Sequence, residues 1–241
     1  RTMHLKCLHI VTLASPLFPC QPFTLPPLPS NTLLHSTKLF TSSVTDDILP
    51  PFNSLDSYLS YLSTHASLPR GFLVSSSTTT FIPPEAPSMG PLPIRGTLIY
   101  LPDGPTTSWS AVFTKNRFPG APITVGKTRL GQPLQAIVVN NKVSNVCSPT
   151  GVEDSLTVCD AVADALELPL GAASVLPSST GVIGWKLPSE ELTELVPRVV
   201  EGLQGESAMA LAEGIMTTDR YPKLRSVELS SGARIVGCAK G

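Results

Sequence analysis

The chain has 241 residues, 41% of them hydrophobic, and a formal net charge of −1. This length and composition allow a buried core in one large domain or two small ones. The near-neutral charge disfavours nucleic acid and anionic membrane surfaces as partners, and no continuous apolar run is long enough to predict a membrane span.

Residues 1–45 contain no Asp or Glu and only three Lys or Arg, and Asp46 and Asp47 then open a segment of ordinary acidity. An acid-poor, hydroxyl-rich leader is typical of an organellar transit peptide. Six prolines interrupt the compact apolar core that a secretory signal needs, and the scarcity of Arg favours a plastid over a mitochondrion. We predict an organellar leader over residues 1–45, with a disordered chain end as the alternative.

Residues 46–95 are rich in Ser, Thr and Pro, with short β-prone runs at 71–74 and 79–82. We expect this segment to be a loosely ordered lead-in or a family-specific decoration. From Gly96 onward the pattern changes, and apolar runs alternate with turns that contain Pro, Gly and Asp. These runs predict buried strands at 97–101, 110–114 and 136–139.

The 154–167 segment predicts a helix, because its apolar residues recur at helical spacing and Pro169 ends it. A strand at 172–176 follows. A second helix begins at Pro188 and carries an apolar stripe that consists of Leu192, Leu195, Val196, Val199 and Leu203. Pro197 should kink or divide that helix.

The remaining residues predict a third helix at 207–216 and two strands, 225–229 and 233–236, joined by a turn. The mixture of helices and strands indicates an α/β (α+β) fold, in which mixed sheets pack against helices. We place the principal domain at residues 96–241.

Catalysis by histidine is disfavoured, because all four histidines lie in the first 65 residues. The five scattered cysteines contain no C-x-x-C pair, which argues against a disulfide framework and a structural zinc site and favours a reducing compartment. Phosphate- and dinucleotide-binding glycine motifs are also missing from the sequence. We therefore predict no metal and no resident cofactor.

Three motifs appear in a distinctive order: S-S-T-G-V-I-G-W at 178–185, M-T-T-D at 216–219 and G-C-A-K-G at 237–241. Together they resemble glutamate N-acetyltransferases, also called ornithine acetyltransferases. The resemblance covers residues 96–241 and implies the fold of the self-cleaving aminopeptidase and ornithine acetyltransferase superfamily. An Asn-rich stretch at 138–146 also resembles the family, but it departs from the usual pattern at 147–151, and we assign it no function.

The resemblance implies a role for each motif. A glycine after a hydroxyl residue lets the backbone turn sharply, so that N–H groups can point at one spot. In the family the matching Thr-Gly pair stabilises the negative oxygen of the tetrahedral intermediate, so the resemblance implies that Thr180 and Gly181 form the oxyanion hole. Thr217 would contact substrate, and Lys240 would offer a counter-charge to the α-carboxylate of ornithine or glutamate. Without the resemblance, each motif has a purely structural explanation. The 178–181 segment would be a strand-to-helix turn, 216–219 a helix end, and Lys240 a solvated lysine.

Members of this family cleave themselves before a threonine, which then starts a second chain and carries the acetyl group. N-acetylornithine donates the acetyl group and leaves as ornithine, and glutamate then accepts the acetyl group. This reaction is a recycling step of arginine biosynthesis. The free α-amine of that threonine would act as its base. Acetyl-CoA is an additional donor in some members.

This sequence stops before such a threonine. The resemblance thus implies an alpha chain that lacks the nucleophile, is inactive alone and pairs with a beta chain in a heterotetramer of two alpha and two beta chains. We expect an organellar matrix location for a eukaryotic protein and a cytoplasmic one otherwise. The alternatives are a self-cleaving N-terminal-nucleophile aminopeptidase or amidase, which hydrolyses its substrate, and an inactive truncated remnant.

Overall fold

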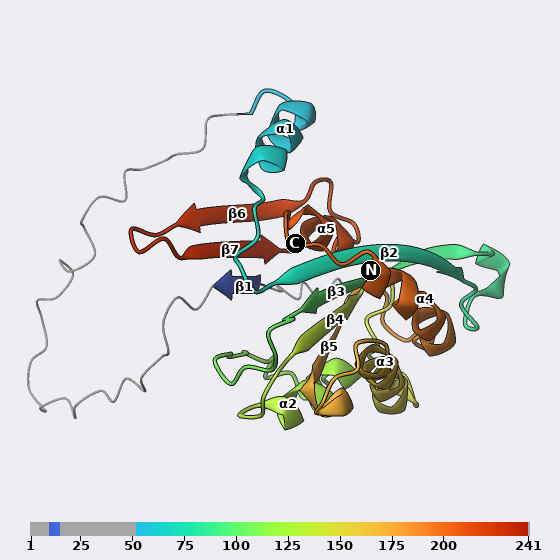
Figure 1. The fold of residues 1–241 in the computed structure, drawn as a ribbon. Helices are drawn as coiled ribbons and strands as arrows, with labels where there is room; N and C mark the ends of the chain where they lie inside the picture. Colours follow the sequence, from blue (N-terminus) through green and yellow to red (C-terminus); the bar gives the residue numbers. More distant parts are fainter. Residues whose placement is uncertain (1–9, 15–51, 241) are drawn as a thin grey trace, which may run out of the picture.

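The structure is a computed structural model that describes residues 10–14 and 52–240. Its centre is a four-stranded sheet in the order β2-β3-β4-β5, which lies in the middle of the molecule in Figure 1. The bounds are β2 Leu73–Phe81, β3 Leu92–Tyr100, β4 Ala136–Asn140 and β5 Val175–Ser179. Neighbouring strands are antiparallel except β4 and β5, which are parallel. The parallel pair makes this a mixed sheet.

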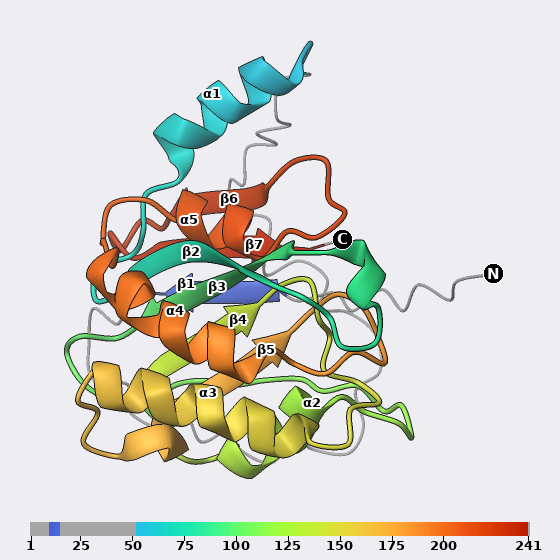
Figure 2. The ribbon, with the colours of Figure 1, turned by 90° about the vertical axis from the view of Figure 1, so that its right-hand side faces the viewer.

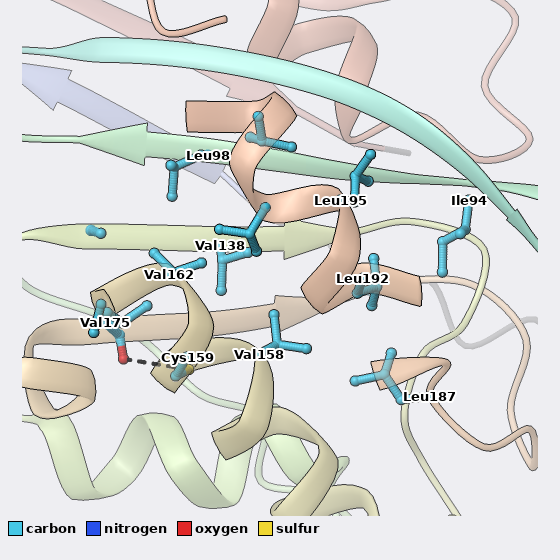
Figure 3. Close-up of a cluster of buried hydrophobic side chains, with 14 of the residues drawn as sticks. Ile94, Leu98, Val138, Val158, Cys159, Val162, Val175, Leu187, Leu192 and Leu195 are labelled. Carbon is cyan, nitrogen blue, oxygen red and sulfur yellow. Dashed lines mark hydrogen bonds between the residues drawn. The ribbon is translucent and has the colours of Figure 1, made fainter. Parts of the chain in front are cut away.

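Helices α3 (Gly151–Ala165) and α4 (Ser189–Glu201) cover one face of this sheet (Figure 2). Side chains alternate along a strand, so Leu98 and Val138 face these helices and join a buried cluster with Val158 and Leu195 (Figure 3). Helix α3 connects β4 to β5, which is how the chain returns to pair two strands in parallel. Helix α2 (Ala121–Arg129) packs beside β5 and α3.

A second, antiparallel sheet lies over the opposite face, with the order β1-β7-β6. Its strands are β1 Ile10–Ala14, β6 Lys223–Glu228 and β7 Arg234–Ala239. Helix α5 (Met209–Gly214) lies between the two sheets, and α1 (Leu55–His65) projects at the edge of the molecule (Figures 1 and 2). Leu211, Leu224 and Ile99 share one buried cluster across these layers. The prediction of an α/β fold with mixed sheets and packed helices is confirmed.

The three predicted helices are present with shifted ends. Helix α3 begins three residues earlier than the predicted 154, and α4 begins just after Pro188. Pro197 lies inside α4, which continues to Glu201 and is not divided. The third helix is shorter than the predicted 207–216, and the β6–β7 hairpin confirms the two strands predicted near the end of the chain.

The prediction of a strand at 110–114 is wrong. Residues 110–114 form irregular chain, and Val112 is 99% exposed. The β3 strand before this segment already pairs with β2 and β4, and Phe113 instead packs against Gly126 of α2. The strand predicted at 172–176 is displaced, because residues Gly171–Ser174 form a 3₁₀ turn before β5.

The expectation of a loosely ordered 46–95 segment is also wrong for the described residues 52–95. They contain α1, all of β2 and the start of β3, and the two β-prone runs belong to the single strand β2 or its ends. Strand β1 falls inside the predicted leader, most of which lies outside the described residues. None of the helices in the described ranges is both long and apolar enough to cross a membrane.

The described cysteines differ sharply in their environment. Cys147 is exposed, whereas Cys159 and Cys238 are buried, and burial raises the pKa of each buried thiol to about 12. Since the thiolate is the reactive form, we expect a thiol reagent at pH 8 to modify Cys147 rapidly and the other two only on unfolding. The measurement is thiol titration of a variant with Cys7 and Cys20 replaced by Ser, with denaturant as the control. Rapid reaction of a second thiol would contradict this expectation.

Candidate functional site

The loops that follow β4 and β5 meet at one edge of the central sheet, because the two strands are parallel. They run side by side through backbone hydrogen bonds. The N–H of Val182 donates to Lys142 O at 2.8 Å, that of Ser144 to Val182 O at 2.9 Å, and that of Gly184 to Val146 O at 2.9 Å. The 178–185 motif therefore lies directly on the Asn-rich loop.

Gly181 lies directly against the backbone of Lys142 in the Asn-rich loop. Its φ is +139°, and a Cβ built there would lie 2.1 Å from both the carbonyl carbon and the oxygen of Lys142. A side chain is thus excluded by sterics and disfavoured by backbone conformation. The interpretation from sequence, that a glycine lets the backbone turn sharply here, agrees with this geometry.

Thr180 is 7% exposed, and its backbone N–H donates to Asn140 O at 3.0 Å. That amide is therefore engaged in the fold. By contrast, the N–H of Gly181 has no hydrogen-bond acceptor within residues 10–14 and 52–240. Of the two backbone N–H groups at this turn, that of Gly181 is therefore the one that the fold leaves without an acceptor in the described ranges.

Two buried asparagines hold the loop in place. Asn140 Nδ2 donates to Asn141 O at 3.0 Å and to Val143 O at 2.8 Å, and Asn140 Oδ1 accepts from the Ser179 hydroxyl. Asn141 reaches in another direction: its Oδ1 accepts from Arg95 N at 2.8 Å, and its Nδ2 donates to Met216 O at 2.8 Å. The loop is thus tied to the second predicted motif.

Thr217 follows Met216 and is half-buried in a short turn after α5. Its N–H donates to Asp219 Oδ2 at 3.0 Å, and Asp219 Oδ1 is 2.7 Å from Lys223 Nζ. The Asp219 side chain is 1% exposed, and Lys223 Nζ also lies 4.9 Å from the centre of the Tyr221 ring. A buried carboxylate, paired with a half-buried lysine, therefore fixes the backbone of Thr217.

Lys240 follows β7 directly and is half-buried. In the hairpin Ala239 pairs with Lys223, so Lys240 lies at the end of β7 where the 216–219 turn enters β6. The structure thus joins Thr180 to the Thr217 segment through Asn140 and Asn141. Strand pairing brings Lys240 to the Thr217 end. Between residues 52 and 240, no hydrogen bond or ion pair links Lys240 to Thr180 or Thr217.

A groove of about 700 Å³ lies beside this end of the hairpin. Tyr58 of α1 lines one side, and Tyr221, Lys223, Arg225 and Ala239 line the other. A much smaller void of about 20 Å³ lies within the core under Ser178 and Ser179. The four predicted site residues line neither space. No three His, Cys, Asp or Glu side chains in the described ranges are grouped to hold a metal ion.

Asn140 and Asn141 are the residues of this site that we missed, since we assigned no function to 138–146 from sequence. The available signal was an Asn pair at the carboxyl end of an apolar strand. Parallel pairing with β5 was not evident from the sequence, and it is this pairing that places Asn140 beside Thr180.

The chain is similar to known proteins over 72% to 75% of its length. It is 35% identical over 179 residues to "Arginine biosynthesis bifunctional protein ArgJ" of Nitratidesulfovibrio vulgaris, covering 72% of this chain and 43% of that protein. It is 33% identical over 193 residues to "Arginine biosynthesis bifunctional protein ArgJ, mitochondrial" of Schizosaccharomyces japonicus, covering 75% and 42%. The chain therefore spans less than half the length of these curated relatives.

Among solved structures, the chain resembles ornithine acetyltransferase of Mycobacterium tuberculosis complexed with ornithine. The TM-score is 0.63 and the identity 29%, over 73% of this chain and 91% of the solved chain. The sequence model of the ArgJ family matches residues 96–241, the same range as the resemblance drawn from the three motifs. The chain belongs to the ArgJ family.

Proposed function

We propose that this chain supplies the oxyanion hole and part of the substrate pocket of a glutamate N-acetyltransferase. The observation that carries the proposal is the Thr180–Gly181 turn, which leaves one hydroxyl and one N–H available on a strand-end loop. Such paired donors stabilise the negative oxygen of a tetrahedral intermediate in acyl transfer. The reaction is acetyl transfer from N-acetylornithine to glutamate, with ornithine as the leaving amine.

In this proposal a threonine at the start of a second chain attacks the acetyl carbonyl, and its own α-amine takes the hydroxyl proton. The carbonyl oxygen becomes an oxyanion that accepts hydrogen bonds from the Thr180 hydroxyl and the Gly181 N–H. Ornithine then leaves with a proton, and glutamate attacks the acetyl-threonine by the reverse path. Thr217 and Lys240 contact the amino-acid part of the substrate.

The protein acts as an alpha chain paired with a beta chain, in a heterotetramer of two of each. Residues 1–45 direct it to an organelle, a proposal supported by their lack of acidic residues and by the mitochondrial name of the Schizosaccharomyces japonicus relative. No cofactor takes part.

Replacing Lys240 with Ala is expected to raise KM for N-acetylornithine roughly 10-fold, because a carboxylate partner contributes to binding of the ground state. We expect kcat to change little. Steady-state kinetics of the complete, self-cleaved protein measure this, with Lys127→Ala on the exposed side of α2 as the matched control. An unchanged KM would show that Lys240 does not contribute to substrate binding.

The proposed function is tested with N-acetylornithine that carries a labelled acetyl group, incubated with the complete protein and glutamate. We expect the label to appear in N-acetylglutamate, with one ornithine released for each acetyl group moved. Release of labelled acetate at the same rate with or without glutamate would instead identify a hydrolase, the alternative within this superfamily. Absence of any reaction would favour the inactive remnant.

A further inference from the structure

We propose that Asn141 is a positioning residue that sets the placement of Thr217 relative to the Thr180–Gly181 turn. The proposal rests on the proposed function, since it assumes that both segments contact one substrate. Asn141 would touch no substrate itself, because it is 9% exposed and both polar atoms of its side chain are engaged within the protein.

The peptide group between Met216 and Thr217 is held at both of its ends. Its carbonyl oxygen accepts the Asn141 Nδ2 donor at 2.8 Å, and its N–H donates to Asp219 Oδ2 at 3.0 Å. Two hydrogen bonds in opposite directions fix the rotation of that peptide plane. They therefore fix the direction in which the Thr217 side chain leaves the backbone.

The peptide group between Asn140 and Asn141 is also held by hydrogen bonds at both of its ends. Its carbonyl oxygen accepts the Thr180 N–H at 3.0 Å, and its N–H donates to Arg95 O at 3.2 Å. One residue thus joins the peptide that supports the Thr180 turn to the peptide that carries Thr217. The hydrogen bond from Asn141 to Met216 spans 75 residues of sequence and connects the end of β4 to the segment after α5.

Arg95 strengthens this connection from β3. Its N–H donates to Asn141 Oδ1 at 2.8 Å, and its guanidinium donates to Glu213 O, near the end of α5, at 2.8 Å. The end of α5 is therefore attached to the central sheet at two carbonyl groups, Glu213 and Met216. Small errors in placement at a reacting centre lower the rate steeply, on the order of 10²-fold for 1 Å.

The test variant is Asn141→Asp, which keeps the shape and the acceptor for Arg95 but loses the donor to Met216 O. In the complete protein we expect kcat/KM for N-acetylornithine to fall on the order of 10- to 100-fold. The same change made in a Thr217→Ala background should cost much less, because the residue that Asn141 positions has already been removed. The double-mutant cycle should show a coupling of about 10-fold.

Asn145→Asp is the matched control. Asn145 is buried in the same loop, and its Nδ2 donates to Gly151 O at 2.8 Å and to Ser155 Oγ at 2.9 Å, so it attaches the loop to α3. Loss of the Asn145 amide donor should destabilise the loop without a specific effect on Thr217. The effects of Asn145→Asp and Thr217→Ala on kcat/KM should therefore be additive. Should Asn141→Asp fail to fold, Asn141→Ala enters the same cycle.

Amide hydrogen exchange provides a readout that does not depend on activity. Faster exchange at the Thr217 N–H in Asn141→Asp, but not in Asn145→Asp, supports the positioning role even if the wild-type protein transfers no acetyl group and the proposed function fails. Additive effects of Asn141 and Thr217 in an active protein, or unchanged exchange at Thr217, would overturn the proposal.

Discussion

Replacing Gly181 with Ala is expected to lower the free energy of unfolding by about 3 kcal/mol or more, the sum of overpacking and backbone strain. The added Cβ would lie 2.1 Å from the backbone carbonyl of Lys142, which cannot rotate away as a side chain can. The φ of +139° is also a conformation that residues with a Cβ rarely adopt. Both penalties act at the contact between the two site loops.

Gly184→Ala is the matched control, because Gly184 also has a positive φ, +86°, but a Cβ there would meet no atom within 4 Å. We expect this variant to lose only about 1 kcal/mol from backbone strain. Equilibrium unfolding in urea of wild type and both variants measures the difference. Equal midpoints for the two alanine variants would show that the loops separate freely at Gly181.

The second large effect is expected for Thr180→Ala. If the proposed function holds, this change should lower kcat on the order of 10²- to 10³-fold, as removal of an oxyanion donor does in acyl-transfer enzymes. The hydroxyl would meet a full negative charge only in the tetrahedral intermediate, so KM should change little. The backbone N–H of Thr180, which bonds to Asn140 O, is retained in this variant, and the fold should persist.

Thr180→Ser is the control for this experiment, because it keeps a hydroxyl on the same turn and should retain much of the wild-type kcat. Both variants are compared by steady-state kinetics after self-cleavage has been verified. A Thr180→Ala variant with wild-type kcat would show that the turn is only structural.

The parts of the fold that could be predicted from sequence are those in which a local pattern determines burial. In α4 the apolar residues recur on one face, and Leu192, Leu195, Val196 and Val199 are all buried. The apolar run 136–139 likewise became β4, which lies between two strands. In both cases spacing along the chain and the final environment agree.

The predictions from sequence were wrong for segments whose structure depends on whether another strand pairs with them. Strand β2 contains six consecutive Ser and Thr residues, 75–80, which suggested a loose segment, yet it pairs with β3 along its entire length. The 110–114 run has the composition of a strand but no strand pairs with it in the described part of the chain. Strand propensity acts only when a neighbouring edge is available.

The candidate site shows the same division. The need for glycine at 181 follows from sequence motif and turn chemistry, whereas the importance of Asn141 depends on a contact with Met216, 75 residues away. Thr217 could be chosen from the motif, but its attachment to Asp219 and Asn141 required the folded chain. Hydrogen bonds between distant loops have no periodic signal in the sequence.

The most direct test of the account is isotope exchange in the half-reaction. The complete protein is incubated with N-acetylornithine and labelled ornithine in the absence of glutamate. Transfer through an acetyl-enzyme, formed by way of a tetrahedral intermediate that Thr180 and Gly181 stabilise, predicts that label enters N-acetylornithine. It also predicts that Thr180→Ala slows this exchange on the order of 10²- to 10³-fold. Exchange that requires glutamate, or that proceeds equally fast in Thr180→Ala, would contradict the account.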